Sequence, residues 1–228
     1  MALPETTHVT WTPSYRLIPS RFPPVSVFDR VADAADLEAV FYVENLTNPR
    51  LRQEAGDISL VPVDERVTGP GTTPIMAAFT HLDPEGSRFT DGSYGVYYAA
   101  RSLDTAIAET RHSRARFLAR TQEAAMEIDM RTYLTDVTGS LHDIRSRTDL
   151  PDVYDPDHYA AGQALGRALR MENAWGVLYD SVRHSNGQCA AVFRPKALSN
   201  CRQGPHFCYV WDGTRISTVY EKRHYEAR

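Results

Sequence analysis

The sequence predicts an α+β domain whose central sheet is mixed but mostly antiparallel, with helices flanking it. Strand-like and helix-like segments follow one another without the regular βαβ alternation that builds a parallel sheet. Two late stretches, "VRHSNGQC" (182–189) and "WDGTR" (211–215), have the spacing of turns between antiparallel strands. No stretch has the composition of a linker, so we expect a single domain over residues 1–228.

The N-terminal part of the chain has the least regular pattern. Five prolines interrupt residues 1–24, where only "SYRLI" (14–18) favours a short strand. Residues 32–46 carry apolar side chains at helical spacing and precede an Asn-Pro pair, which predicts a helix. Residues 52–90 are rich in turn signals, so we expect a long excursion with one short helix or strand at "PIMAAF" (74–79).

Clearer organisation begins after Arg88. The stretch "YGVYYAA" (94–100) is aromatic and β-branched, which predicts a strand. A helix is expected over 102–120, because its apolar side chains form one stripe, Ser102 can cap its N-terminus and Asp104 lies in its first turn. A second helix is expected over 157–172, and further strands at 124–130, 132–137, 175–182, 188–193 and within 207–221.

Composition and charge exclude several classes of function. The formal net charge of −4 and the absence of a dominant basic face argue against direct nucleic-acid binding. No apolar run is long enough to cross a membrane, and the N-terminus has neither region of a signal peptide. The three cysteines are sparse and odd in number, which favours a reducing compartment. We therefore expect a cytoplasmic protein.

Three polar residues surround the junction between the strand at 94–100 and the helix that follows it: Arg88, Tyr98 and Glu109. Tyr97 and Tyr98 point to opposite faces of a strand, so one can be core while the other lines a cleft. Glu109 lies off the apolar stripe of the helix, about 100° from its neighbour Thr110. Each residue alone has an ordinary structural explanation, and the residues by themselves leave a structural and a functional explanation equally open.

Other arrangements with catalytic or metal-binding chemistry are weak. Ser181 lies at the end of a strand with His184 three residues away, but no G-x-S-x-G turn surrounds it, which argues against a serine hydrolase. Cys201, His206 and Cys208 do not have a zinc-site spacing and have no evident fourth ligand. We expect no metal.

Several motifs occur in the order found in one known family. "GVYYAARSLDTAIAET" (95–110) resembles the central motif of RES-domain proteins, a G-x-x-Y-x-A strand followed by an S-x-x-T-A-x-x-E helix. "WGVLYDSVRHSNGQCAAVF" (175–193) resembles the later G-I-x-Y-x-S-V-R element of the family. "PSRFPPVSVFDRV" (19–31) and "LTNPRLR" (46–52) are similar to the N-terminal portion of its longer subgroup. The chain thus resembles the RES-domain toxins of RES–Xre toxin–antitoxin pairs, the ParT-type toxins in particular.

This resemblance implies a fold similar to that of bacterial ADP-ribosyltransferase toxins. It also implies an NAD⁺-consuming toxin that takes NAD⁺ as its substrate, needs no metal, and is paired with an Xre-type helix-turn-helix antitoxin. Residues 86–222 would form the catalytic core and residues 1–85 an N-terminal extension. By the resemblance, the family's functional residues fall on Arg88, Tyr98, Glu109 and Ser181, with an N-terminal arginine at Arg16 or Arg21.

The resemblance assigns a role to each of these residues. Glu109 would stabilise positive charge on the ribose as the bond to nicotinamide breaks. Arg88 would hold the pyrophosphate or the adjoining ribose, and Tyr98 would stack on the nicotinamide ring. Ser181 would hold either the nicotinamide amide or Glu109. The family often has G-R-W-N at the arginine, whereas this chain has "SRFT" at residues 87–90, so that Arg88 is assigned by its ten-residue spacing to Tyr98.

The acceptor of ADP-ribose remains open between two kinds of enzyme. A protein acceptor from the host would make the chain a mono-ADP-ribosyltransferase, and residues 1–85 favour this because they add surface for recognition. Water or phosphate would make it an NAD⁺ glycohydrolase or phosphorylase. A non-catalytic interaction protein is the alternative from another functional class.

Overall fold

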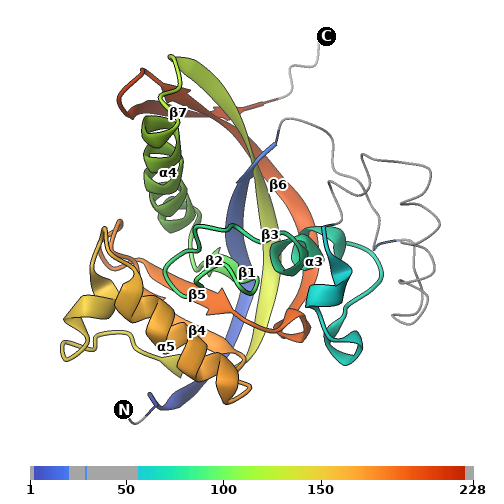
Figure 1. The fold of residues 1–228 in the computed structure, drawn as a ribbon. Helices are drawn as coiled ribbons and strands as arrows, with labels where there is room; N and C mark the ends of the chain where they lie inside the picture. The colour runs from blue at the N-terminus through green and yellow to red at the C-terminus, as the bar shows by residue number, and fades with distance from the viewer. Residues whose placement is uncertain (1–2, 21–28, 30–55, 224–228) are drawn as a thin grey trace.

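The computed structural model describes residues 3–20, 29 and 56–223 (Figure 1). Within these residues the fold is α+β, with a seven-stranded sheet and three α-helices. The strands are β1 (Thr6–Pro19), β2 (Tyr97–Ala100), β3 (Met126–Asp143), β4 (Gly176–Asp180), β5 (Gln188–Val192), β6 (Leu198–Trp211) and β7 (Ile216–Lys222). The helices are α3 (Thr73–Thr80), α4 (Leu103–Arg120) and α5 (Ala160–Met171), together with the single-turn helices η2 (Ile58–Leu60), η3 (Val63–Glu65), η4 (Pro151–Tyr154) and η5 (Pro195–Ala197).

The sheet is mostly antiparallel and partly closed on itself. Its order is β1-β2-β5-β4-β3-β6-β7, and β1 also pairs with β3, so that five strands form a ring from which β6 and β7 extend. The β3–β4 pair is parallel and short, whereas the other strand pairs are antiparallel. The expected mixed, mostly antiparallel sheet with flanking helices is confirmed.

The ring of strands is open between β1 and β2. These two strands meet at a single pair of residues, Tyr15 and Ala100, whereas β1 pairs with β3 along nearly its whole length. Beyond that pair, no residues of β1 and β2 are paired with each other. We call the gap beyond this pair the split between β1 and β2.

Two hydrophobic cores lie on the two sides of the sheet. One includes side chains of α3, and the other includes side chains of α4 and α5. Tyr97 belongs to the first core and is fully buried, while Tyr98 is partly buried and packs against the second. The opposite orientation expected for these adjacent tyrosines is confirmed.

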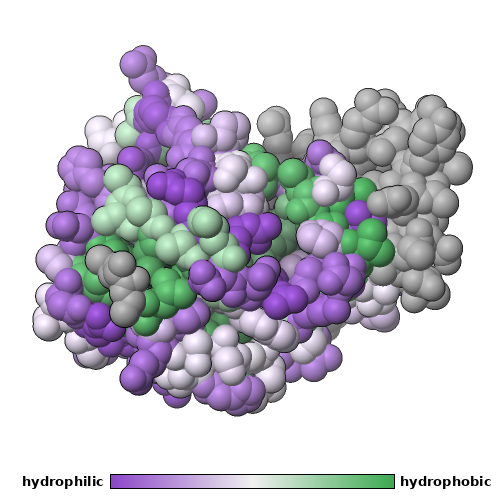
Figure 2. Space-filling model, turned by 60° about the horizontal axis from the view of Figure 1, so that its bottom comes forward, coloured by the Kyte–Doolittle hydropathy of each residue, from purple (hydrophilic) through white to green (hydrophobic). Residues whose placement is uncertain are grey.

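Helix α5 is amphipathic and covers the sheet with its apolar face. Its buried residues are Gly162, Leu165, Gly166 and Leu169, at the spacing of one helical face. Figure 1 shows α5 beside β4 and β5, and α4 contributes to the same hydrophobic core as α5. The face seen in Figure 2 is mainly hydrophilic, with hydrophobic residues gathered in separate areas. Among the described residues no helix is long and apolar enough to cross a membrane.

The largest departures from the sequence-based expectations concern strand length. Residues 6–19 form one long strand, not an irregular segment with a short strand at 14–18. Pro13 is accommodated because the register shifts between Trp11 and Ser14, so its missing N–H interrupts no regular ladder. Residues 126–143 likewise form the single strand β3 where two strands were expected. The helix predicted over 32–46 lies outside the described residues.

Candidate active site

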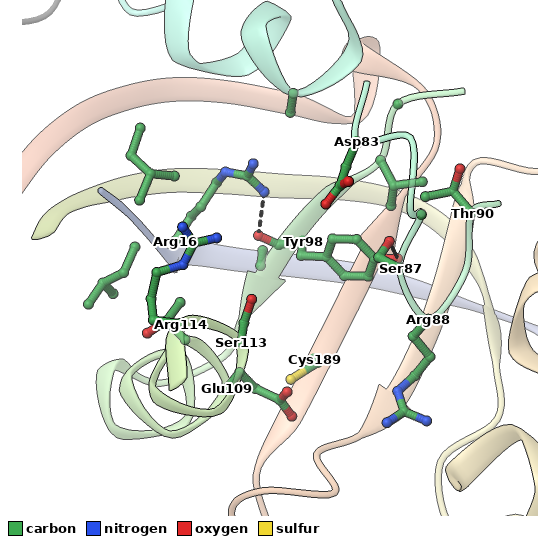
Figure 3. Close-up of a pocket in the computed structure, with 18 of the residues that line it drawn as sticks. Arg16, Asp83, Ser87, Arg88, Thr90, Tyr98, Glu109, Ser113, Arg114 and Cys189 are labelled. Atoms are coloured by element: carbon green, nitrogen blue, oxygen red, sulfur yellow. Dashed lines mark hydrogen bonds between the residues drawn. The ribbon is translucent and has the colours of Figure 1, made fainter. Parts of the chain in front are cut away.

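A cavity of about 500 Å³ occupies the split between β1 and β2. Its walls come from β1 (Tyr15 to Pro19), the loop after α3, β2 and one face of α4, and Tyr159 also lines it. Arg16, Arg88, Tyr98 and Glu109 all line this one cavity, and Figure 3 shows their side chains around it.

Glu109 is held in place by Ser181. The Ser181 hydroxyl donates a hydrogen bond of 2.6 Å to Oε1 of Glu109, across 72 positions of the sequence. The same hydroxyl oxygen accepts hydrogen bonds from the backbone N–H groups of Arg183 (3.1 Å) and His184 (3.0 Å). Ser181 is therefore itself fixed by the β4–β5 turn and can hold one rotamer of Glu109.

The β4–β5 turn is attached to the N-terminus of α4. Nδ1 of His184 and Oγ1 of Thr105 are 2.9 Å apart. A Cβ on Gly187 would lie 2.8 Å from the same threonine hydroxyl, so only glycine allows this close approach. Ser102 caps α4 by accepting from the backbone N–H of Thr105, as its sequence predicts. Helix and turn thus form one support for Glu109.

Arg88 is buried, with 8% of its surface exposed. Its Nη1 donates to the backbone carbonyls of Val153 (2.7 Å) and Asp155 (2.9 Å), at the end of η4. Its guanidinium also lies 4.9 Å from the ring centroid of Tyr159, and Arg116 stacks on the same ring at 5.1 Å. A guanidinium held this way has part of its donor capacity already used within the protein.

Tyr98 anchors the loop that carries Arg88. Its hydroxyl lies 2.7 Å from Oγ of Ser87 and accepts a hydrogen bond of 3.0 Å from the backbone N–H of Phe89. Burial raises the pKa of Tyr98 to about 12, so the phenol is neutral near pH 7. The ring lines the cavity, while the hydroxyl contacts the Ser87 side chain before Arg88 and the Phe89 backbone after it.

Arg16 spans the split between β1 and β2. Its Nη1 donates to the backbone carbonyl of Tyr98 at 3.2 Å (dashed in Figure 3), and its guanidinium lies 4.5 Å from the ring centroid of Tyr97. Burial lowers the pKa of its guanidinium below the usual value. Of the two N-terminal arginines that the sequence offered, Arg16 lines the cavity, and Arg21 lies outside the described residues.

Sequence reasoning did not identify Arg114, Tyr159, Asp83 and Cys189 as residues of this cavity. Arg114 follows Glu109 by five residues on the same helix, about 140° around its axis, so the helical spacing alone does not place the two side chains in one cavity. Cys189 appears beside Glu109 in Figure 3, and burial raises its pKa, so that it stays a neutral thiol. The other residues come from loops whose positions depend on the fold.

The cavity therefore combines one oriented carboxylate with several cationic side chains. Among the described residues, no group of three or more histidine, cysteine, aspartate or glutamate side chains could hold a metal ion. Guanidinium groups bind anions, and a carboxylate stabilises a neighbouring centre that becomes positive. The arrangement fits an anionic substrate that develops positive charge at one carbon.

Comparison with known proteins agrees with the motifs. Residues 64–212 match the family described as "RES domain". The uncharacterized protein y4oC of Sinorhizobium fredii (strain NBRC 101917 / NGR234) is 38% identical over 206 residues, which cover 90% of this chain and 86% of the relative. The crystal structure of the M. tuberculosis MbcT–MbcA toxin–antitoxin complex aligns at 15% identity with a TM-score of 0.43, over 88% of this chain and 87% of that chain.

The likeness to that complex is distant, whereas the domain match and the sequence relative each cover most of the chain. The protein belongs to the RES-domain family.

Proposed function

We propose that this protein is an NAD⁺-consuming toxin that cleaves the bond between nicotinamide and ribose and transfers ADP-ribose to a protein. The observation that carries the proposal is the 2.6 Å hydrogen bond from Ser181 to Glu109, which orients a carboxylate inside the arginine-lined cavity. Membership of the RES-domain family and the motif around Glu109 support it independently.

The chemistry needs an oriented carboxylate and no general acid. The nicotinamide of NAD⁺ is cationic, so when its bond to C1′ of the ribose breaks, the electron pair neutralises the leaving ring. Positive charge then develops on the ribose, as in the cleavage of glycosides. A carboxylate fixed beside this carbon stabilises the charge without reorganising, and this is the role of Glu109.

The remaining residues bind and orient the substrate. The ring of Tyr98 offers a flat surface for the nicotinamide, and Ser181 keeps Glu109 from rotating away. Arg88, bonded to Val153 and Asp155, contributes a fixed positive charge to the wall of the cavity. Each of these roles is positional, because the bond that breaks involves only atoms of the substrate.

A protein is the proposed acceptor of ADP-ribose. The RES domain match begins at residue 64, and we propose that the chain before it takes part in recognising a protein acceptor. The β1 strand is the exception, since it belongs to the central sheet. Attack on C1′ by a side chain of the acceptor would complete the transfer, with loss of one proton from that side chain.

The test is to incubate the purified protein with NAD⁺ labelled in the adenylate moiety, together with a cell lysate. Glu109→Gln keeps the size of the side chain and removes its charge, and Glu123→Gln is the control, because Glu123 is an exposed glutamate beyond α4. We expect nicotinamide release and a labelled protein band, with both reduced about 100-fold or more in Glu109→Gln only. Label found only in free ADP-ribose or its phosphate would replace the transferase by a glycohydrolase or phosphorylase. No release of nicotinamide would contradict the enzymatic proposal.

We expect the partner to be an Xre-type helix-turn-helix antitoxin, on the basis of the family resemblance. Induced expression of the protein should stop growth, expression of Glu109→Gln should not, and coexpression with the antitoxin should restore growth. Growth that is unaffected by the wild-type protein would contradict the toxin assignment while leaving the chemistry to the labelling experiment.

A further inference from the structure

Two separate segments support the charged residues of the cavity: the β4–β5 turn and the loop over residues 153–159. The turn holds Glu109 through the hydroxyl of Ser181. The loop holds Arg88 through two of its backbone carbonyls. The position of the guanidinium relative to the carboxylate therefore depends on how the loop is placed against the turn.

Arg183 lies on the turn and reaches the loop. Its backbone N–H donates to the hydroxyl of Ser181 at 3.1 Å. Its Nη2 donates to the backbone carbonyl of Pro156 and lies 3.9 Å from Oδ1 of Asp157. One residue thus contributes to both supports, with its backbone to the first and with its guanidinium to the one that holds Arg88.

The turn is fixed to the rest of the protein independently of Arg183. His184 contacts the hydroxyl of Thr105 at the start of α4, and Gly187 approaches the same side chain closely. The hydroxyl of Ser181 also accepts from two backbone N–H groups of the turn. The turn can therefore serve as the fixed point from which a side chain positions the loop.

The loop is anchored at its start and exposed in its middle. The Tyr154 hydroxyl donates to the carbonyl of Ile144 (2.7 Å) and accepts from the backbone N–H of Asp180 (3.3 Å). Residues 156–158 are exposed, and the hydrogen bond from Arg183 attaches this exposed part to the turn. Loss of that bond would leave the second half of the loop without this attachment.

We infer that Arg183 is a positioning residue of the active site, which fixes the loop against the turn and so places Arg88 relative to Glu109. The inference rests on the proposed function, in which these two charged groups act on one substrate. A charged donor strengthens the hydrogen bond to the loop carbonyl. The ion pair with Asp157 contributes little, because this carboxylate is 68% exposed and 3.9 Å away.

The inference is tested by the kinetics of nicotinamide release and by hydrogen exchange in residues 153–159. Arg183→Met keeps the apolar part of the side chain and removes its donors, whereas Arg183→Lys keeps the charge and one donor group. The matched control is Arg215→Met, because Arg215 also lies between two antiparallel strands and pairs with an aspartate but does not line the cavity. Thermal unfolding of each variant shows whether the fold is retained.

Arg183→Met should lower kcat/KM for NAD⁺ about 10- to 100-fold, because Arg88 and Glu109 no longer keep their relative position. Arg183→Lys should recover part of this loss, since its ammonium group can donate to the same carbonyl. Arg215→Met should have the kinetics of the wild type.

A double-mutant cycle distinguishes positioning from a general structural role. In an Arg88→Gln background there is no guanidinium to position, so adding Arg183→Met should lower kcat/KM by no more than about twofold. Arg88→Lys replaces Arg88→Gln in the cycle if the latter does not fold or has no measurable rate.

Hydrogen exchange provides a measurement that does not depend on activity. The backbone N–H groups of Asp157 and His158 donate to the Asp155 carboxylate within the loop. These amides should exchange faster in Arg183→Met than in the wild type or in Arg215→Met, because the loop opens more often.

Wild-type kinetics in Arg183→Met, or equal losses with and without the Arg88 guanidinium, would overturn the inference while nicotinamide release still supports the proposed function. Unchanged hydrogen exchange in the loop would also overturn it. Faster exchange in Arg183→Met, in a protein that releases no nicotinamide from NAD⁺, would support the placement of the loop by Arg183 and overturn the proposed function.

Discussion

The hydroxyl of Ser181 makes three hydrogen bonds at once, donating to Glu109 and accepting from the backbone N–H groups of Arg183 and His184. A hydroxyl has one proton and two lone pairs, so all of its capacity is used. The direction of the bond is fixed as a result, because the proton can only go to the carboxylate. Ser181 thereby transmits the rigidity of a turn to a side chain on α4.

Ser181→Ala should lower kcat about 10- to 100-fold with little change in the KM for NAD⁺, because Glu109 loses its orientation but the substrate contacts remain. Steady-state kinetics of nicotinamide release measure this, and Ser181→Thr should recover part of the rate because it restores the hydroxyl. The control is Ser217→Ala, on β7 and away from the cavity. A rise in KM with kcat unchanged would indicate that Ser181 binds substrate directly.

Tyr98→Phe separates the two roles of this tyrosine, because phenylalanine keeps the ring and loses only the hydroxyl. The backbone N–H of Phe89 and the Ser87 hydroxyl would lose their partner, which should lower the free energy of unfolding by about 1–3 kcal/mol. Urea unfolding measures this change. Arg88 should also lose its fixed position and nicotinamide release should slow. A variant with wild-type stability and rate would show that the ring alone matters.

Among single residues, the sequence indicated Glu109, Tyr98, Arg88 and Ser181 through motifs and spacing, and the structure brings all four to one place. The family resemblance left two partners for Ser181, the nicotinamide amide and Glu109, so the sequence did not predict their hydrogen bond. Whether these residues bind NAD⁺ stays a prediction. The position of Arg114 depends on how α4 packs against β1, which no local pattern records.

At the scale of elements, α5 packs closely against the loop that contains Arg88, and two glycines one helical turn apart lie at the contact. A Cβ on Gly162 would lie 2.4 Å from the carbonyl oxygen of Arg88, and a Cβ on Gly166 would lie 2.2 Å from that of Phe89. Contacts this short involve backbone atoms that cannot turn away. The helix can therefore approach the loop only because both positions are glycine.

Gly166→Ala should destabilise the protein by about 1–3 kcal/mol, because the clash with the backbone of Phe89 outweighs the gain in helix propensity, which is about 1 kcal/mol. Thermal or urea unfolding measures the difference. The control is Gly204→Ala, where a Cβ would meet only side-chain atoms at 3.3 Å or more and should have a small effect. A stabilised Gly166→Ala variant would mean that the loop can move away from the helix at little cost.

The elements themselves were predictable to different degrees. Helices α4 and α5 follow from periodicity, and in α4 also from a capping serine, both of which are local properties. Strand lengths were not predictable, because β1 and β3 extend by pairing with each other across more than 100 residues of sequence. Pro13 predicts a break in any strand when only its neighbours in the sequence are considered. In the sheet, the register shift between Trp11 and Ser14 accommodates it within β1.

At the scale of the whole molecule, the cavity exists because the ring of strands does not close completely. The β1–β2 pair contributes one residue pair, and the carbonyl of Tyr98 is satisfied by Arg16, which spans the gap. The sequence predicted the fold class but could not predict this ring, since the closure depends on tertiary pairing. A site at the split is also surrounded by buried aromatic side chains, which give the protein a distinctive response to alkaline pH.

Burial raises the pKa of four tyrosines to about 12, and these are Tyr94, Tyr98, Tyr154 and Tyr209. Their pKa in the unfolded chain is about 10, so the folded state holds the proton more tightly. The resulting stability is fully present below pH 10 and is lost as the pH rises from about 10 to 12. We therefore expect the free energy of unfolding to fall steeply over this interval and the protein to unfold cooperatively within it.

A pH titration that follows tyrosinate absorbance together with near-ultraviolet circular dichroism tests this expectation. Part of the tyrosinate signal should appear only when the dichroism of the folded state is lost, because the buried phenols ionise on unfolding. Tyr98→Phe removes a hydroxyl that bonds to Ser87 and Phe89, so the folded state is less stable. The alkaline unfolding transition of this variant should therefore occur at lower pH. If all tyrosines ionised near pH 10 while the dichroism persisted, these phenols would be accessible to water in the folded protein. The Tyr98 hydroxyl would then be exposed and not buried in the wall of the cavity.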